Sequence, residues 1–267
     1  MKELDNDINK WGLLNSLISI INEGEENSAE VSIAKYLLTN YERMQDLNIY
    51  DVAEECFVSR ATIRRMAQNL GFDNFKALKN QFLKFPNIYS FYHSGIDGSA
   101  PGSDMRQQIS NMAEECESFF TRERLEVITQ EMNSASQIVF LMSDVYSRQS
   151  SEFQKAMILA GKMVRVVSRK YYDNEVLANL KANDIVIVVS ISGFFVSQML
   201  PVIEISNAKK VLLTTIQNEL YEPYFNDVWR ISNEAKVNMK SVYTIYATQY
   251  CLEIISTAYI KKYDTTH

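Results

Sequence analysis

The chain has 267 residues, of which 46% are hydrophobic and 22% charged, and its net charge is −6. This composition is typical of a globular protein and excludes a disordered chain, and the length is sufficient for two domains. No run approaches the roughly 18–20 apolar residues of a membrane helix, and the first ten residues lack the basic-then-apolar profile of a secretory signal. We therefore expect a cytoplasmic protein.

Cysteine and histidine are too few and too scattered to suggest metal or redox chemistry. The three cysteines, Cys56, Cys116 and Cys251, are widely spaced, and the two histidines are His93 and the C-terminal His267. This spacing indicates neither a disulfide framework nor a metal site. We expect buried free thiols, no metal and no cofactor.

Residues 1–85 are predicted to form an all-helical domain. An apolar helix at Trp11–Ile21 is followed by a second helix at Glu30–Asn40, for which Ser28 can serve as the N-cap. Two short helices joined by a tight turn then follow between Ile49 and Leu70. Apolar residues at helical spacing would turn both short helices toward one core: Ile49, Val52, Ala53, Ile63, Met66, Ala67 and Leu70.

The second short helix has a polar face suited to DNA. Ser59 is placed as its N-cap and Gly71 as the left-handed residue that ends it. This arrangement is typical of a helix-turn-helix, whose second helix enters the major groove. The candidate DNA-binding residues are Ser59, Arg60, Thr62, Arg64, Arg65, Gln68, Lys76 and Lys79. We expect Arg60, Thr62 and Arg64 to contact base edges or nearby phosphates, while Ser59, Arg65, Lys76 and Lys79 hold the DNA backbone.

Charge distribution favours DNA binding over the plainer alternative of a solvated basic helix. From Arg60 to Lys84 there are six basic residues and one acidic residue, within a chain that is acidic overall. Basic charge concentrated in this way indicates a nucleic-acid surface.

Residues 86–104 are predicted to form a linker. The stretch Pro86–Gly102 contains three of the eight glycines and two of the four prolines, a composition that disfavours a helix or a central strand.

Residues 105–267 are predicted to form an α/β domain. One or two helices at Met105–Asn133 precede five short apolar runs: Ser136–Ser143, Met163–Ser168, Asp184–Ser192, Lys209–Thr215 and Asp227–Ile231. Helical patterns at Ser151–Ala160, Tyr172–Leu180 and Phe195–Ser206 separate them. Apolar strands alternating with helices predict a five-stranded parallel sheet in a three-layer sandwich. A closing helix at Asn238–Lys262 would direct one side inward, with Val242, Ile245, Tyr246, Gln249, Leu252, Ile255, Ser256 and Tyr259.

Hydroxyl groups follow two of the predicted strands, at the edge where an open α/β sheet binds ligands. One strand end reads MSDVYSRQSS from Met142, and the other reads SISG from Ser190 and leads into a helix. Hydroxyls and free N–H groups at a helix start bind phosphate, although serines there often serve only as helix caps. The candidate ligand-binding residues are Ser143, Ser147, Ser190, Ser192 and Gly193. No catalytic set of residues is apparent at these strand ends.

The first half of the chain resembles the helix-turn-helix domain of RpiR/MurR-type bacterial transcriptional regulators. The matching text is AKYLLTN at Ala34–Asn40 and the segment from Asp51 to Lys79, with VSRATI and NLGFDNFKALK most distinctive. The second half resembles a SIS (sugar isomerase) domain through its strand order and NDIVIVVSISG, at Asn183–Gly193. The resemblance implies a homodimeric regulator of sugar metabolism, with a double-stranded operator and a phosphosugar or other small-molecule effector.

The chain departs from these families at three points. The first phosphate loop of SIS domains has the pattern G-x-G-x-S, whereas FLMSDVYS contains no glycine and places Asp144 near the phosphate position. In the second loop, S-x-S-G-x-T, Phe195 stands at the threonine position directly after Phe194. Phe57 occupies a turn position often held by glycine. Two alternatives therefore stay open: a SIS-fold sugar-phosphate isomerase, and a regulator whose second domain only dimerises.

Overall fold

The computed structural model describes residues 2–84, 89, 93, 103–143, 150–168, 174–191, 193–232 and 241–264. The chain divides into two units, Met1–His93 and Ser94–His267. Most of the predicted linker lies outside the described residues, and its last two positions already belong to a helix. Within the described residues, no helix combines the length and hydropathy needed to cross a membrane.

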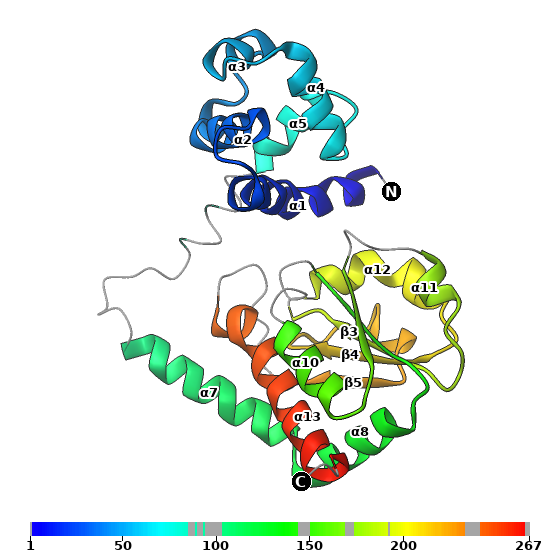
Figure 1. Cartoon of the computed structure of the whole chain (residues 1–267). Coiled ribbons are helices and arrows are strands. Elements are labelled where there is room, and N and C mark those ends of the chain that lie inside the picture. Colours follow the sequence, from blue (N-terminus) through cyan, green and yellow to red (C-terminus); the bar gives the residue numbers. More distant parts are fainter. Residues whose placement is uncertain are drawn as a thin grey trace. The chain divides into compact units, whose positions relative to one another are not determined.

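The first unit is all-helical, as predicted (Figure 1). Its elements are α1 (Lys2–Glu23), α2 (Ala29–Thr39), the 3-10 turn η1 (Tyr41–Arg43), α3 (Ile49–Glu55), α4 (Arg60–Asn69), α5 (Phe75–Gln81) and the 3-10 turn η2 (Phe82–Lys84). One apolar cluster joins these helices and includes Leu17, Ile33, Leu37, Val52, Ile63, Met66 and Leu78. Helix α1 starts nine residues before the predicted helix, because its polar first turns have no apolar periodicity to reveal them.

Side-chain caps fix where the helices of the first unit begin. The Ser28 hydroxyl accepts a hydrogen bond from the N–H of Val31, and the Ser59 hydroxyl accepts one from the N–H of Thr62, as predicted. Asn48 and Asp51 form a reciprocal capping box at the start of α3 that the sequence analysis did not anticipate.

The second unit contains a five-stranded parallel sheet, as predicted, with strand order β2-β1-β3-β4-β5. The strands are β1 (Ile138–Met142), β2 (Val164–Ser168), β3 (Ile185–Val189), β4 (Lys209–Thr214) and β5 (Asp227–Arg230). The helical elements are α7 (Ser103–Phe119), α8 (Arg122–Ser134), α10 (Ser151–Leu159), α11 (Asn174–Ala178), α12 (Phe194–Glu204), the 3-10 turn η4 (Glu222–Tyr224), a π-helical turn (Tyr243–Ala247) and α13 (Thr248–Tyr263).

Alternate strand residues enter two separate cores on the two faces of the sheet. Phe140 and Ile187 pack with residues of α7, α8, α10 and α13, whereas Leu141 and Val188 pack with α11 and α12. Figure 1 shows these two groups of helices on opposite faces, which makes the unit a three-layer sandwich. Strands β1 and β3 are fully buried along their whole length, so polar chemistry is confined to the strand ends.

The predicted inward side of the last helix was wrong at two positions, while its other members are buried or half-buried. Tyr246 and Gln249 are exposed, whereas Tyr243, Ala247 and Cys251 are buried. The π-helical turn at Tyr243–Ala247 makes wider i→i+5 hydrogen bonds, so the residues that face inward no longer follow a regular 3.6-residue repeat. The first three residues of the predicted helix, 238–240, lie outside the described residues.

Because the two units have separate hydrophobic cores, we expect a cavity in the first unit to leave the stability of the second unit unchanged. Ile63 is 1% exposed, so Ile63→Ala should lower the free energy of unfolding of the first unit by about 2–5 kcal/mol. In a Trp11→Phe background, fluorescence reports only Trp229 in the second unit, since the chain has two tryptophans. We expect the denaturation midpoint of Trp229 to stay unchanged, while circular dichroism shows earlier loss of helix. An equal shift of both signals would contradict two independent cores.

Candidate nucleic-acid interface and sheet-edge site

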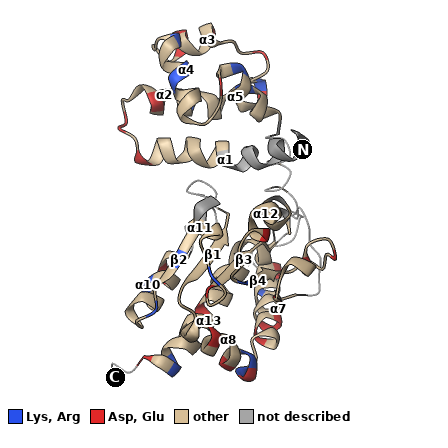
Figure 2. Cartoon of the chain, turned by 90° about the vertical axis from the view of Figure 1, so that its right-hand side faces the viewer, with Lys and Arg blue, Asp and Glu red and all other residues tan. Residues whose placement is uncertain are grey.

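Helix α4 buries its apolar side and exposes its basic side. Ile63, Met66 and Ala67 lie in the core of the first unit. The opposite side exposes Arg60, Arg64, Arg65 and Gln68, and α4 contains no acidic residue. Figure 2 shows basic residues on α4 and on α5. The structure thus places four of the predicted polar residues of α4 on one exposed face, which can meet phosphates and base edges, whereas Thr62 is half-buried.

The start of α4 is ordered by local contacts. The Arg60 guanidinium lies 4.6 Å from the ring centroid of Tyr50, a residue of α3 whose side chain is largely exposed. The hydroxyls of Ser59 and Thr62 lie 2.9 Å apart and hydrogen-bond to each other. The contact between Arg60 and Tyr50 connects the two helices of the motif, and the bond between Ser59 and Thr62 orders the end of α4 where base contacts are expected.

Lys79 makes hydrogen bonds within the first unit, a role that comes in addition to its predicted role on the DNA backbone. Its ammonium group donates hydrogen bonds to the carbonyl oxygens of Gln45, at 3.0 Å, and Leu47, at 3.1 Å. These carbonyls lie in the segment before α3, so Lys79 ties α5 to the entry of the helix-turn-helix. We assign it a positioning role, whereas Lys76 on the same helix is exposed.

Replacing Lys79 should therefore affect stability, whereas replacing Lys76 should not. Lys79→Met leaves the two carbonyls without their charged donor and should lower the free energy of unfolding by about 1.5–3 kcal/mol. Lys76→Met is the matched control and should change stability by less than about 0.5 kcal/mol. Urea denaturation of the two variants measures this difference. Equal stabilities would show that the bonds of Lys79 contribute nothing to the fold.

The turn before α4 contains a backbone conformation that is unusual for its residue. Phe57 has φ = +55°, and it is the one non-glycine residue with positive φ among those the structure describes. A left-handed conformation costs a residue with a Cβ roughly 1–2 kcal/mol. Phe57 is 94% exposed, so no packing among the described residues offsets this cost.

The second candidate site lies at the carboxyl ends of β1 and β3, where the order of the strands reverses. Met142 pairs with Val189 in the sheet, so Ser143 and Ser190, which follow them, end neighbouring strands. Ser143 is half-buried and Ser190 is buried. Ser147, Asp144 and Ser192 lie outside the described residues.

Hydrogen bonds hold the loop after β3 in place. The Ser190 hydroxyl accepts from the N–H of Val196 at 3.0 Å, so it caps the first turn of α12. The Thr215 hydroxyl donates to the carbonyl of Ile191 at 2.9 Å. Gly193, the N-cap of α12, has φ = +74°, a conformation that glycine adopts without strain. For Ser190 the structure therefore shows the helix-cap role that was kept as the alternative.

Tyr221, which the sequence analysis did not identify, borders this loop. A Cβ atom at Gly193 would lie 2.6 Å from the Tyr221 hydroxyl oxygen, so only glycine fits beside it. The Tyr221 side chain is buried, and neither its hydroxyl nor the Nε of Arg230 has a hydrogen-bond partner among the described residues. Burial, followed by the nearby Glu222 carboxylate, raises the pKa of Tyr221, so the hydroxyl stays a neutral donor. As one of fifteen tyrosines, it carries no sequence signal.

Phe195, at the position of the family's threonine, packs against the apolar cluster that contains Val196 and Tyr221. Its half-buried ring therefore contributes to the core between α12 and the sheet, while nothing is described for the side chain of Phe194.

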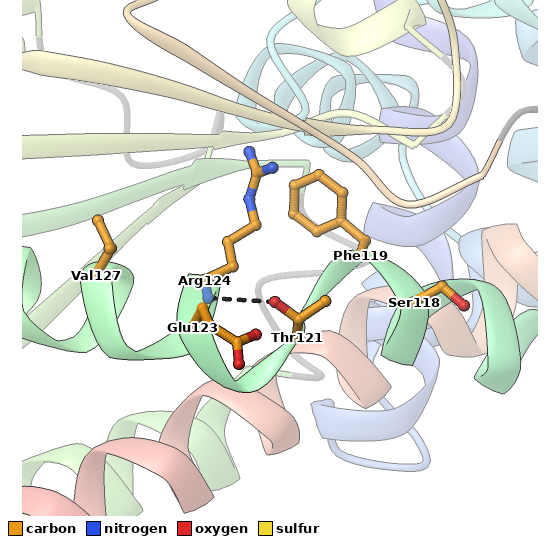
Figure 3. Close-up of a pocket in the computed structure, with 6 residues that line it drawn as sticks. All are labelled: Ser118, Phe119, Thr121, Glu123, Arg124 and Val127. Atoms are coloured by element: carbon orange, nitrogen blue, oxygen red, sulfur yellow. Dashed lines mark hydrogen bonds between the residues drawn. The ribbon is translucent and has the colours of Figure 1, made fainter.

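A hollow lies at the junction of α7 and α8, and the contacts of its arginine are structural. It is lined by Ser118, Phe119, Thr121, Glu123, Arg124 and Val127 (Figure 3). The Arg124 guanidinium lies 3.9 Å from the centroid of the Phe119 ring and pairs with Asp227 at 3.1 Å. Because Asp227 begins β5, the hollow lies at the amino ends of the strands, opposite the edge where such sheets bind ligands.

Metal chemistry has no visible basis in the part of the chain that the structure describes. Those residues contain no group of three or more His, Cys, Asp or Glu side chains that could hold an ion. The three cysteines are free and buried, and the sulfur atoms of Cys116 and Cys251 lie 3.7 Å apart.

Comparison with known proteins relates the first unit to a family model and the whole chain to a solved structure of similar fold. Residues 14–84 match the model of the helix-turn-helix domain of the rpiR family. No curated protein matches the sequence. The structure of the Vibrio vulnificus NanR protein complexed with ManNAc-6P is 15% identical, with a TM-score of 0.53, over 94% of this chain and 92% of that chain. The sugar isomerase domain of an RpiR transcription factor from Sphaerobacter thermophilus is 13% identical, with a TM-score of 0.46, over 59% of this chain and 90% of that chain.

The family match covers the helix-turn-helix, and the likeness to NanR extends over both units as a likeness of fold. Residues 14–84 thus match the helix-turn-helix domain of the rpiR family, and an α/β unit with a five-stranded parallel sheet follows them in this chain.

Proposed function

We propose that this chain is a transcriptional regulator that binds duplex DNA through α4. The observation that carries the proposal is the match of residues 14–84 to the rpiR-family helix-turn-helix domain, whose second helix exposes Arg60, Arg64 and Arg65. Arginine forks bind phosphates and the O6 and N7 atoms of guanine. Ser59, Thr62, Gln68 and Lys76 complete the proposed contact set. We further propose that the protein acts in the cytoplasm as a homodimer that binds paired half-sites.

Arg64→Ala tests the placement of α4 in the groove. The variant removes one exposed guanidinium and should weaken binding to a duplex selected by the wild-type chain by about 1–3 kcal/mol. It should also reduce the salt slope of the binding constant by about 1 if Arg64 neutralises a phosphate. Fluorescence anisotropy across a series of salt concentrations measures both quantities.

Lys35→Ala is the matched control for this experiment. Lys35 lies on α2 of the same unit and pairs with Glu26, so its loss changes charge without touching α4. Wild-type affinity and salt slope for Arg64→Ala would place the DNA contact elsewhere.

We propose that the second unit senses a phosphorylated sugar. Support comes from its fold, which it shares with NanR in complex with ManNAc-6P, and from the edge formed by Ser143, Ser190 and Gly193. The start of α12 offers backbone N–H groups to a phosphate. We propose Ser147 and Ser192, which lie outside the described residues, as further ligand-binding residues. The Tyr221 hydroxyl and the Arg230 Nε are donors without a partner among the described residues, whereas the Nη2 of Arg230 pairs with the Glu222 carboxylate at 2.5 Å.

This sensor is preferred to an isomerase because the α/β unit is joined to a DNA-binding domain. Isomerisation also needs a general base beside the substrate carbon, and the described strand ends offer hydroxyls in that place. Assays of aldose–ketose interconversion should therefore show no turnover.

A thermal-shift titration tests the sensor. ManNAc-6P, other hexose phosphates and pentose phosphates would be compared with the matching unphosphorylated sugars. A ligand at about 100 times its dissociation constant should stabilise the native state by about 2.7 kcal/mol and raise the melting midpoint. Tyr221→Phe and Ser192→Ala should keep the midpoint of the free protein and lose the shift. If every phosphosugar is silent while DNA binding persists, phosphosugar sensing is refuted, and dimerisation remains as the proposed role of the second unit.

A further inference from the structure

Phe57 combines three features that its own fold does not require. Its backbone is left-handed, its ring is 94% exposed, and it lies in the turn of the helix-turn-helix, two residues before the N-cap Ser59. A bulky residue with positive φ is a rare and strained choice, and such residues occur mainly at functional positions.

The hydrogen bonds of the turn do not depend on the phenyl group. The backbone N–H of Phe57 donates to the carbonyl of Glu54 at 3.2 Å, and that of Val58 donates to the carbonyl of Ala53 at 3.0 Å. Glycine or asparagine would keep these bonds at lower conformational cost. Val58, the next residue, supplies the apolar contact with the core. The Phe57 ring is therefore not part of the core that the described residues of this unit form.

The surroundings of Phe57 indicate which molecule its ring meets. After it come the exposed Arg60 and Arg64 of α4, and before it stand the exposed Glu54 and Glu55 of α3. The arginines attract a duplex, whereas the two glutamates keep phosphate groups away from the end of α3. A ring at this border suits the apolar surface of a duplex, which consists of thymine methyl groups and deoxyribose carbons.

We propose that Phe57 is a DNA-contact residue, whose ring packs against a thymine methyl group or a deoxyribose when α4 enters the major groove. This inference rests on the proposed function of the first unit. Burial of the phenyl ring at the interface offsets the conformational free energy that the left-handed backbone costs in the free protein. This would explain why phenylalanine occupies a position suited to glycine.

The test uses the full-length chain with Phe57→Asn and Phe57→Gly. The probe is a duplex that the wild-type chain selects from a random-sequence pool, in one version with thymine and in another with uracil. Phe57→Leu keeps apolar surface at the same position. Leu83→Ser is the matched control, because Leu83 is 61% exposed in the same unit but lies in η2. Anisotropy gives the dissociation constant at several salt concentrations, and thermal melting gives the midpoint.

We expect Phe57→Asn and Phe57→Gly to bind about tenfold to a hundredfold more weakly, with an unchanged salt slope, since the ring neutralises no phosphate. Their melting midpoints should equal or exceed that of the wild type. Phe57→Leu should retain part of the affinity, and Leu83→Ser should behave as the wild type. If the wild type binds the uracil duplex more weakly than the thymine duplex, and Phe57→Asn shows no such difference, the ring contacts the thymine methyl group. If the wild type binds both duplexes equally, the ring contacts deoxyribose.

Wild-type affinity in Phe57→Asn overturns the inference while the proposed DNA binding stands. A lower melting midpoint in both Phe57→Asn and Phe57→Gly overturns it by showing a structural role for the ring. Loss of self-association in sedimentation, with DNA affinity of the monomer unchanged, overturns it in favour of a protein contact. A wild-type chain that selects no duplex refutes both the inference and the proposed function.

Discussion

Parallel strands buried on both faces determine where the second unit can carry out chemistry. Every residue of β1 and β3 is buried and apolar, so polar groups have room only beyond the strand ends. At the carboxyl end, the Ser190 hydroxyl and the backbone of Gly193 bring the start of α12 to the point where the strand order reverses. A residue with a side chain does not fit at position 193, because the Tyr221 hydroxyl occupies the space that its Cβ atom would need.

The first unit solves a different problem, since it must keep a small helical core and still present a basic surface. Caps at Ser28, Asn48, Ser59 and Asn74 supply acceptors for N–H groups that short helices leave unpaired. Lys79 supplies donors for carbonyls in the segment before α3. Other side chains thus pair these backbone groups, and the arginines of α4 remain exposed on the surface.

Local pattern predicted most of the fold, because period and caps are properties of neighbouring residues. The five strands, the cap at Ser59 and the glycine that ends α4 at Gly71 follow from such patterns. The roles of Lys79 and Tyr221 did not follow, because each depends on a group about thirty residues away in the chain. The wider turn at Tyr243–Ala247 likewise leaves no mark in apolar spacing.

The contact of Arg60 with Tyr50 has a consequence for the entropy cost of the proposed DNA binding. A free arginine side chain samples many rotamers, and ordering it on a ligand costs entropy. Here the ring of Tyr50 already restricts the guanidinium, so part of that cost is met when the protein folds. Lysine at this position would keep the charge but lose the planar group that stacks, and with it the preformed orientation. The side chain is thus selected for its shape as much as for its charge.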